Sequence, residues 1–185
     1  MDSTDPRQPF ERFAPLLARE GVDVASATGE QLEAAMERAR HRQAAAVVHV
    51  RAVLQAHARG ETSTAGALLQ ALERSAEDTP PPVPDALTVA SRFAQLCQSV
   101  GPELPLAVVE LVREVAGGPD APEGMARLCA ATLLDLDASA GLTTVARRHG
   151  VASALYAAAA MTSGTFRAWA DASGTPMAEL ISTHA

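Results

Sequence analysis

An unbroken run without glycine or proline extends from residue 30 to residue 59, and no other feature constrains the fold as strongly. Thr28 and Gln31 have the spacing of a capping box, in which each side chain accepts a hydrogen bond from the other residue's backbone N–H. Gly60 is typical of a residue that ends a helix. The pattern predicts one helix over residues 29–59, roughly 45 Å long at 1.5 Å per residue. Such a long helix needs tertiary packing along much of its length.

One side of this helix carries a candidate dimer seam. At about 100° per residue, six positions share a sector of roughly 60°. They are Leu32, Met36, Gln43, Val47, Val50 and Leu54. The polar Gln43 has two interpretations: it sets the register of a helix–helix interface, as in a homodimer, or it lies at the rim of the core with its amide in water.

The second half of the same helix concentrates positive charge. Residues 38–59 contain five Arg and three His but no acid, a formal charge of +5, whereas the other ten Arg and the 22 acids of the chain give −12. This separation indicates either a surface that meets an acidic partner or a face that pairs with acids of the same fold, which is the commoner case. The candidate partner-binding residues are Arg38, His41, Arg42, His49 and Arg59.

The rest of the chain also favours helices. Ala, Leu and Val supply most apolar residues, Ile181 is the only isoleucine, and aromatic residues make up 3%. A first helix is predicted from Pro6 to residue 20, with a kink at Pro15. Further helices are predicted at 63–76, 86–100, 102–117, 122–138, 142–149, 151–171 and 176–182. We therefore predict an all-α multi-helix bundle, with the long helix in an antiparallel hairpin followed by an Ala-rich helical lobe.

A Pro-rich segment divides the predicted helices into two groups. Consecutive prolines are stiff and extended, so residues 79–84 are the best candidate for a linker. It separates an N-terminal helical hairpin region, residues 1–78, from a C-terminal helical bundle, residues 85–185. The sequence leaves open whether these two regions share one core.

The residue types present argue against most catalytic chemistry. The chain has no Lys and no Asn, so Schiff-base and phosphate-loop lysines are excluded, and no GxSxG motif is present. His41, His49 and His57 recur every eight residues, but eight residues advance a helix by roughly 80°, so the three rings fan apart and predict no metal site. Cys97 and Cys129 lie among apolar residues and are expected to be core residues. We expect no cofactor, and the balance leans against an enzyme.

Residues 142–156, LTTVARRHGVASALY, suggest one alternative function. Ala146, Gly150 and Val151 occupy the small, turn and apolar positions of a helix-turn-helix, and the segment resembles that DNA-binding pattern. The resemblance implies a ligand-responsive transcription regulator that uses residues 142–160. However, the second helix would have no Arg, Gln or Asn to read base edges, and the acidic chain argues against nucleic acid as a partner.

The charge pattern carries our main functional prediction. We expect a non-enzymatic helical interaction or regulatory module that docks through the basic face of helix 29–59. Its partner would be an acidic protein or a second copy of the chain. A small-molecule-binding helical bundle is a further alternative, since a bundle can enclose an apolar pocket that no motif announces. The polar N-terminus and the absence of a long apolar run predict a cytoplasmic protein with no membrane segment.

Overall fold

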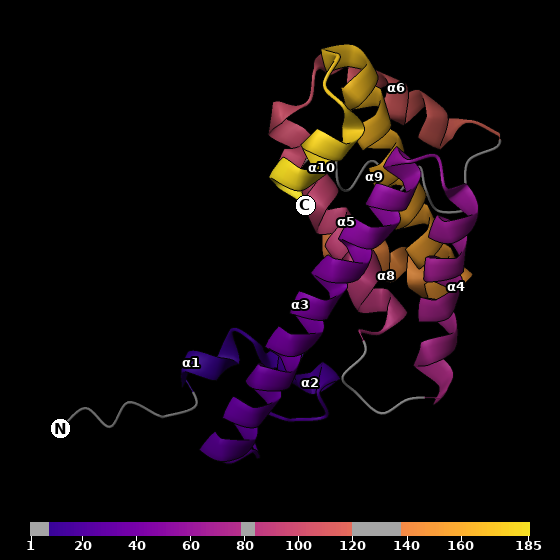
Figure 1. Ribbon diagram of the computed structural model, residues 1–185. Helices are drawn as coiled ribbons and strands as arrows, with labels where there is room; N and C mark the ends of the chain where they lie inside the picture. Colours follow the sequence, from indigo (N-terminus) through magenta and orange to yellow (C-terminus); the bar gives the residue numbers. More distant parts are fainter. Residues whose placement is uncertain (1–7, 79–83, 120–137) are drawn as a thin grey trace.

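The computed structural model describes residues 8–78, 84–119 and 138–185, and the regular elements within these ranges are all helical (Figure 1). In chain order they are α1 (Gln8–Glu11), α2 (Ala14–Arg19), α3 (Gly29–Ala58), α4 (Thr62–Asp78), α5 (Ala86–Val100), the 3-10 turn η1 (Gly101–Glu103), α6 (Leu106–Gly117), α8 (Ala138–His149), α9 (Val151–Ser173) and α10 (Met177–His184). The prediction of an all-α multi-helix bundle is confirmed. Residues 122–137 of the predicted helix 122–138, Cys129 and most of the segment 79–84 lie outside the described residues.

The long helix α3 begins and ends as the sequence predicts. The Gln31 N–H donates to the Thr28 hydroxyl at 3.3 Å, and the Thr28 N–H donates to the Gln31 side chain at 2.8 Å. At the other end Gly60 has a φ of +75°, which glycine adopts without a steric penalty. The N–H groups of Gly60 and Glu61 donate to carbonyls in the last turn of α3. The chain then reverses, and α4 runs back beside α3 (Figure 1).

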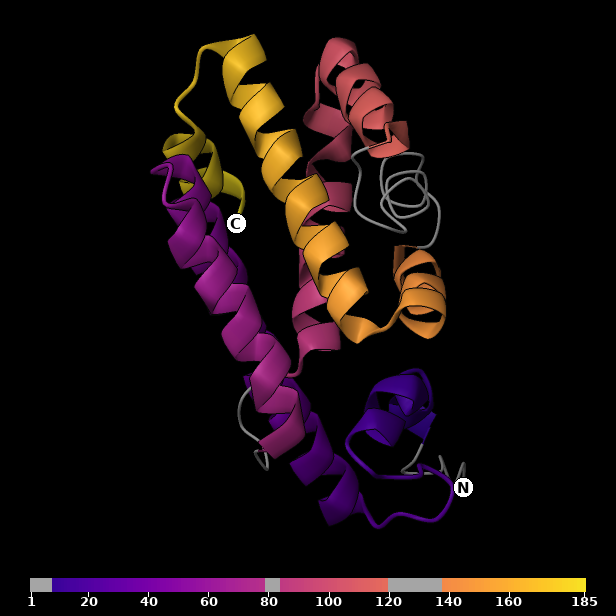
Figure 2. The same cartoon turned by 90° about the vertical axis from the view of Figure 1, so that its right-hand side faces the viewer.

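Helix α9 is the centre of the bundle. It packs against α5, α6, α8 and α10 and against α3 (Figure 2). Four of its alanines are almost completely buried, and their small side chains allow neighbouring helices to approach closely: Ala154, Ala157, Ala158 and Ala159. The buried Thr162 hydroxyl lies 2.8 Å from the carbonyl oxygen of Ala158 and 3.1 Å from that of Phe93 on α5. Its polar group is therefore satisfied inside the core.

The buried apolar residues form two separate clusters. The larger one contains residues from the second half of α3, from α4 and from α5, α6, α8, α9 and α10. The smaller one consists of Leu17, Val24, Ala27, Leu32 and Ala35. We call residues 8–42, which comprise α1, α2 and the first part of α3, the arm, because they extend away from the bundle (Figures 1 and 2). The main core thus combines residues from before and after the Pro-rich segment. The boundary between the two apolar clusters falls within α3 and not at the prolines.

The start of helix α6 differs from the sequence prediction. It begins at Leu106, not at Pro102, because Pro105 has no N–H and its ring excludes a continuous helix through that position. Residues 101–103 form a 3-10 turn. Leu111 and Val115 on α6 are exposed, at 48% and 55%, whereas Val108 and Val112 are buried.

Candidate functional site

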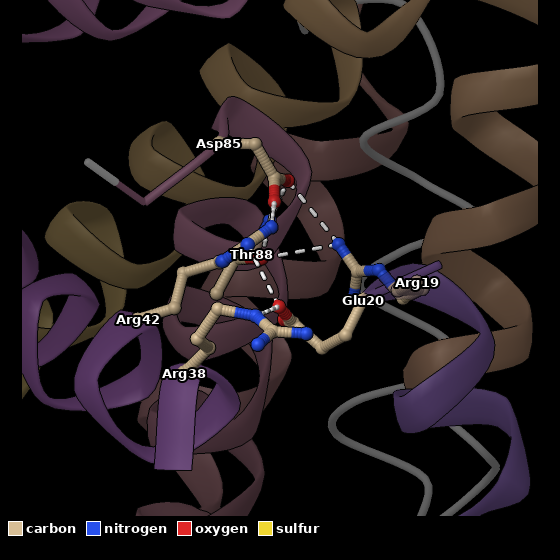
Figure 3. A network of polar contacts seen from close by, with 6 residues as sticks. All are labelled: Arg19, Glu20, Arg38, Arg42, Asp85 and Thr88. Carbon is tan, nitrogen blue, oxygen red and sulfur yellow. Dashed lines mark hydrogen bonds and ion pairs between the residues drawn. The ribbon is translucent and has the colours of Figure 1, made fainter. Parts of the chain in front are cut away.

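Six polar side chains from three separate segments meet where the arm joins the bundle (Figure 3). They are Arg19 and Glu20 at the end of α2, Arg38 and Arg42 on α3, and Asp85 and Thr88 at the start of α5. The smaller apolar cluster lies in the arm and the larger one in the bundle, so this polar network occupies the junction between them. We call it the junction network.

Glu20 is the most buried charge of the junction network. Its side chain is 3% exposed, and its Oε2 atom lies 2.9 Å from Nη2 of Arg42 and 3.6 Å from Nε of Arg38. A carboxylate removed from water to this extent is tolerated only when cations and hydrogen bonds replace the lost hydration. The two guanidinium groups supply that replacement from neighbouring turns of α3 (Figure 3).

Asp85 caps α5 and extends the network into the bundle. Its carboxylate accepts hydrogen bonds from the backbone N–H and from the hydroxyl of Thr88, both at 2.8 Å. Nη2 of Arg19 lies 3.2 Å from this carboxylate, and Nη1 of Arg42 lies 3.6 Å from it. Burial acts to raise the pKa of Asp85, but the bonds from Thr88 and the charges of Arg19 and Arg42 outweigh it and hold the pKa below its usual value.

The lowered pKa of Asp85 predicts a loss of stability in acid. The contribution is fully present above about pH 3.8, the ordinary pKa of the group, and is lost as the pH falls through the lower folded-state value. Asp85→Asn keeps a side chain that can cap α5, and we expect it to reduce the free energy of unfolding by about 1 kcal/mol at pH 7. Urea unfolding between pH 7 and pH 3 should show the two proteins converging in acid. Parallel curves would contradict this account.

The geometry of the junction network leaves no room for a substrate. A void of about 10 Å³ adjoins Arg42, Gln43 and Thr88, and this is at most the space of one water molecule. The Nε atom of Arg42 is buried without a hydrogen-bond partner. The arrangement can therefore fasten the arm to the bundle by charge, but it cannot hold and transform a ligand.

The structure does not place the five predicted partner-binding residues together on one unpaired basic face. Arg38 and Arg42 belong to the junction network. The others lie elsewhere on α3: His41 pairs with Glu37 at 3.1 Å, Arg59 pairs with Glu61 at 2.8 Å, and His49 is partly buried. Much of the positive charge in residues 38–59 is thus paired with acids of the same chain.

The six residues of the predicted seam also divide. Leu32, Val50 and Leu54 are buried in the protein's own core, and Met36, Gln43 and Val47 are partly exposed. The other buried positions on α3 are mostly alanines: Ala35, Ala39, Ala46, Val53 and Ala56. The buried face is consequently rotated by roughly 50° from the predicted seam toward the side of Arg42. Large side chains guided the prediction, whereas the small ones decide how closely α3 approaches its neighbours.

Because of this rotation, the exposed face of α3 carries two residues that the sequence analysis did not select. Val48 is 67% exposed, and Arg51 is exposed with no ion-pair partner among the described residues. The alanines of α3 carry the signal that locates these residues. If the alanines are counted as core residues, the helical spacing places Val48 and Arg51 on the opposite, exposed face.

A separate cavity of about 660 Å³ lies at the ends of α3 and α9. His57, Arg59, Arg167 and Asp171 contribute its polar lining. Arg167 donates to the carbonyl of His57 at 3.3 Å, and burial, with the charge of Arg167, lowers the pKa of His57. Arg59 is already paired with Glu61, and the other two charged residues of the lining, Arg167 and Asp171, have opposite signs. Within the described ranges, no cluster of three or more His, Cys, Asp or Glu residues could hold a metal ion.

The segment that resembles a helix-turn-helix leads into the buried part of α9. Gly150, with a φ of +87°, joins α8 to α9. Between residues 154 and 159, the positions other than Tyr156 are almost completely buried, so this part of α9 is the centre of the core. It offers little side-chain surface that could enter a DNA groove.

Comparison with known proteins identifies no relative. No protein-family model matches the chain, and no curated protein or solved structure is significantly similar to it. None of the helices in the described ranges combines the length and the apolar character needed to cross a membrane. The functional inference therefore rests on the surfaces and contacts of this chain.

Proposed function

We propose that the chain is a non-enzymatic helical interaction module that docks an acidic amphipathic helix of a partner protein on the exposed face of α3. The observation that carries this proposal is the pair formed by Val48 and Arg51. A largely exposed valine lies one turn from an exposed arginine that has no acid to pair with among the described residues.

The positions around this pair have the spacing that a second helix requires. Ala44, Val48, Arg51 and Gln55 are all exposed and follow one another at intervals of four, three and four residues. This spacing brings side chains onto one stripe of a helix and is the pattern by which helices pack side by side. Ala44 and Val48 would contact the apolar face of the partner.

The charge along this stripe favours an acidic partner over a basic one. No acidic residue of α3 follows Glu37, so the stripe from Ala44 to Gln55 presents only Arg51 as a charge. A glutamate or aspartate on the partner helix would pair with Arg51 and improve both the rate and the specificity of association.

Charge reversal at Arg38 and Arg42 would not test this proposal cleanly. Both arginines contact the buried Glu20, so their replacement by glutamate would disturb the junction network itself. Arg51 has no such contact, and Arg51→Glu should leave the fold intact.

Site-specific photocrosslinking in the cells that produce the protein provides the test. A photoreactive phenylalanine analogue at position 48 should yield one dominant adduct with an acidic protein, and Arg51→Glu should abolish that adduct. The control position is 106, because Leu106 is 70% exposed on α6, away from the stripe. The purified partner should then bind with an affinity that falls with salt and drops at least about tenfold with Arg51→Glu. Identical adducts at both positions, or none at position 48, would exclude the proposal.

A further inference from the structure

A second apolar surface lies on the arm, between α1 and the first turns of α3. It is a groove of about 570 Å³ whose apolar lining includes Phe10, Phe13 and Met36. These three side chains pack against the smaller apolar cluster but remain partly exposed. The cluster has five buried members, and the aromatic residues Phe10 and Phe13 at its edge are not completely covered. Partly exposed aromatic rings and Met are typical of the centre of a protein–protein interface.

The charges around this groove are balanced. Arg12 and Arg40 supply two positive charges, and Glu33 and Glu37 supply two negative ones. All four residues are exposed, and the guanidinium of Arg12 lies 4.7 Å from the centre of the Phe13 ring. Arg40 and Glu37 pair with each other at 3.5 Å, but exposed pairs of this kind are weak and exchange partners readily.

This balance indicates which kind of partner fits. A strongly acidic partner would meet Glu33 and Glu37 with like charge, and a strongly basic one would meet the two arginines. A second copy related by a two-fold axis avoids both conflicts, because such an interface is self-complementary and each arginine can face a glutamate of the other copy. The arm also extends away from the bundle (Figures 1 and 2).

We propose that two copies of the chain associate through the groove between α1 and α3. Phe10, Phe13 and Met36 form the apolar centre of the interface, and the four charged residues form its rim. The stripe around Val48 and Arg51 is not part of this interface, so self-association does not depend on the acidic partner inferred above.

Charge reversal with complementary variants tests this interface. The first variant, Glu33→Arg with Glu37→Arg, makes the rim entirely positive, and the second, Arg12→Glu with Arg40→Glu, makes it entirely negative. Sedimentation velocity over a range of concentrations should show a dimer for the unmodified protein. For each variant alone, the dimer dissociation constant should rise at least about tenfold, since like charges then face each other. An equimolar mixture should restore the dimer to within about threefold.

The charge-reversed variants must keep their fold for this test to be valid. Circular dichroism should show unchanged helix content for both variants, because the replaced side chains are exposed and lie outside the junction network. A monomeric unmodified protein at 100 µM, on the order of the weakest stable dimers, would overturn the proposal. Dimers that persist in each variant alone would show that the contact lies elsewhere. Variants that weaken the dimer singly but do not recover on mixing would equally refute the charge pairing.

Discussion

Replacement of Glu20 by glutamine is expected to reduce the free energy of unfolding by about 3 kcal/mol, the scale seen when one partner of a buried ion pair is removed. The carboxylate is 3% exposed and contacts two arginines of α3. Glutamine has nearly the same volume but no charge, so Arg38 and Arg42 would keep their positive charge without the acid nearest to them. Urea unfolding followed by circular dichroism measures the difference.

A matched control comes from the exposed pair of Arg59 and Glu61. Their side chains are 55% and 42% exposed, and their 2.8 Å contact resembles that between Glu20 and Arg42 in length. Glu61→Gln should therefore change the stability far less than Glu20→Gln does, since water screens the charges. Equal effects from the two glutamine variants would show that burial does not strengthen the junction network.

Hydrogen exchange should show where the stability is lost in the Glu20→Gln protein. The arm has its own small apolar cluster, and the junction network joins this cluster to the bundle. Backbone amides in residues 14–36 should exchange faster, whereas those of α5 and α9 should keep their protection. Uniformly faster exchange in all helices would mean that arm and bundle unfold as one unit.

Phe93→Ala is expected to have the other large effect, a loss of about 3–5 kcal/mol of stability. Phe93 is completely buried on α5, and its carbonyl oxygen lies within hydrogen-bond distance of Thr162 on the central helix α9. Truncation leaves a cavity at the contact between these two helices, and rigid neighbours can close it only in part. Because small proteins have only about 5–15 kcal/mol of stability, the variant should be close to global unfolding at elevated temperature.

Thermal and urea unfolding provide the measurement for Phe93→Ala. Leu106→Ala is the control, because this leucine is 70% exposed and its truncation should change the stability by less than about 0.5 kcal/mol. In contrast with Glu20→Gln, exchange should accelerate in α5 and α9. A loss below about 1 kcal/mol for Phe93→Ala would show that α5 does not anchor the core as the packing indicates.

Some parts of this fold follow from the sequence because they depend on neighbouring residues. The capping box of Thr28 and Gln31, the cap formed by Asp85 and the glycine at the end of α3 each involve hydrogen bonds over a few residues. The break between α1 and α2 likewise appears near the predicted kink at Pro15. Helix boundaries were therefore predictable where a local cap defines them, whereas α6 begins at Leu106 after Pro105, and α8 begins at Ala138, four residues before its predicted start.

The candidate surfaces depended on distant residues, and only the tertiary structure decided them. Arg42 is separated by 22 residues from Glu20, and Arg19 by 66 from Asp85, so no local pattern could reveal their pairing. The rotation of α3 that partly buries Arg42 and exposes Val48 has the same origin, because neighbouring helices determine which side chains are removed from water. The sequence alone determined the ends of the helices that a local cap defines, because such caps are short-range hydrogen bonds. The tertiary structure decided which charges are neutralised and which faces stay exposed, because burial and long-range ion pairing are properties of the packed helices together.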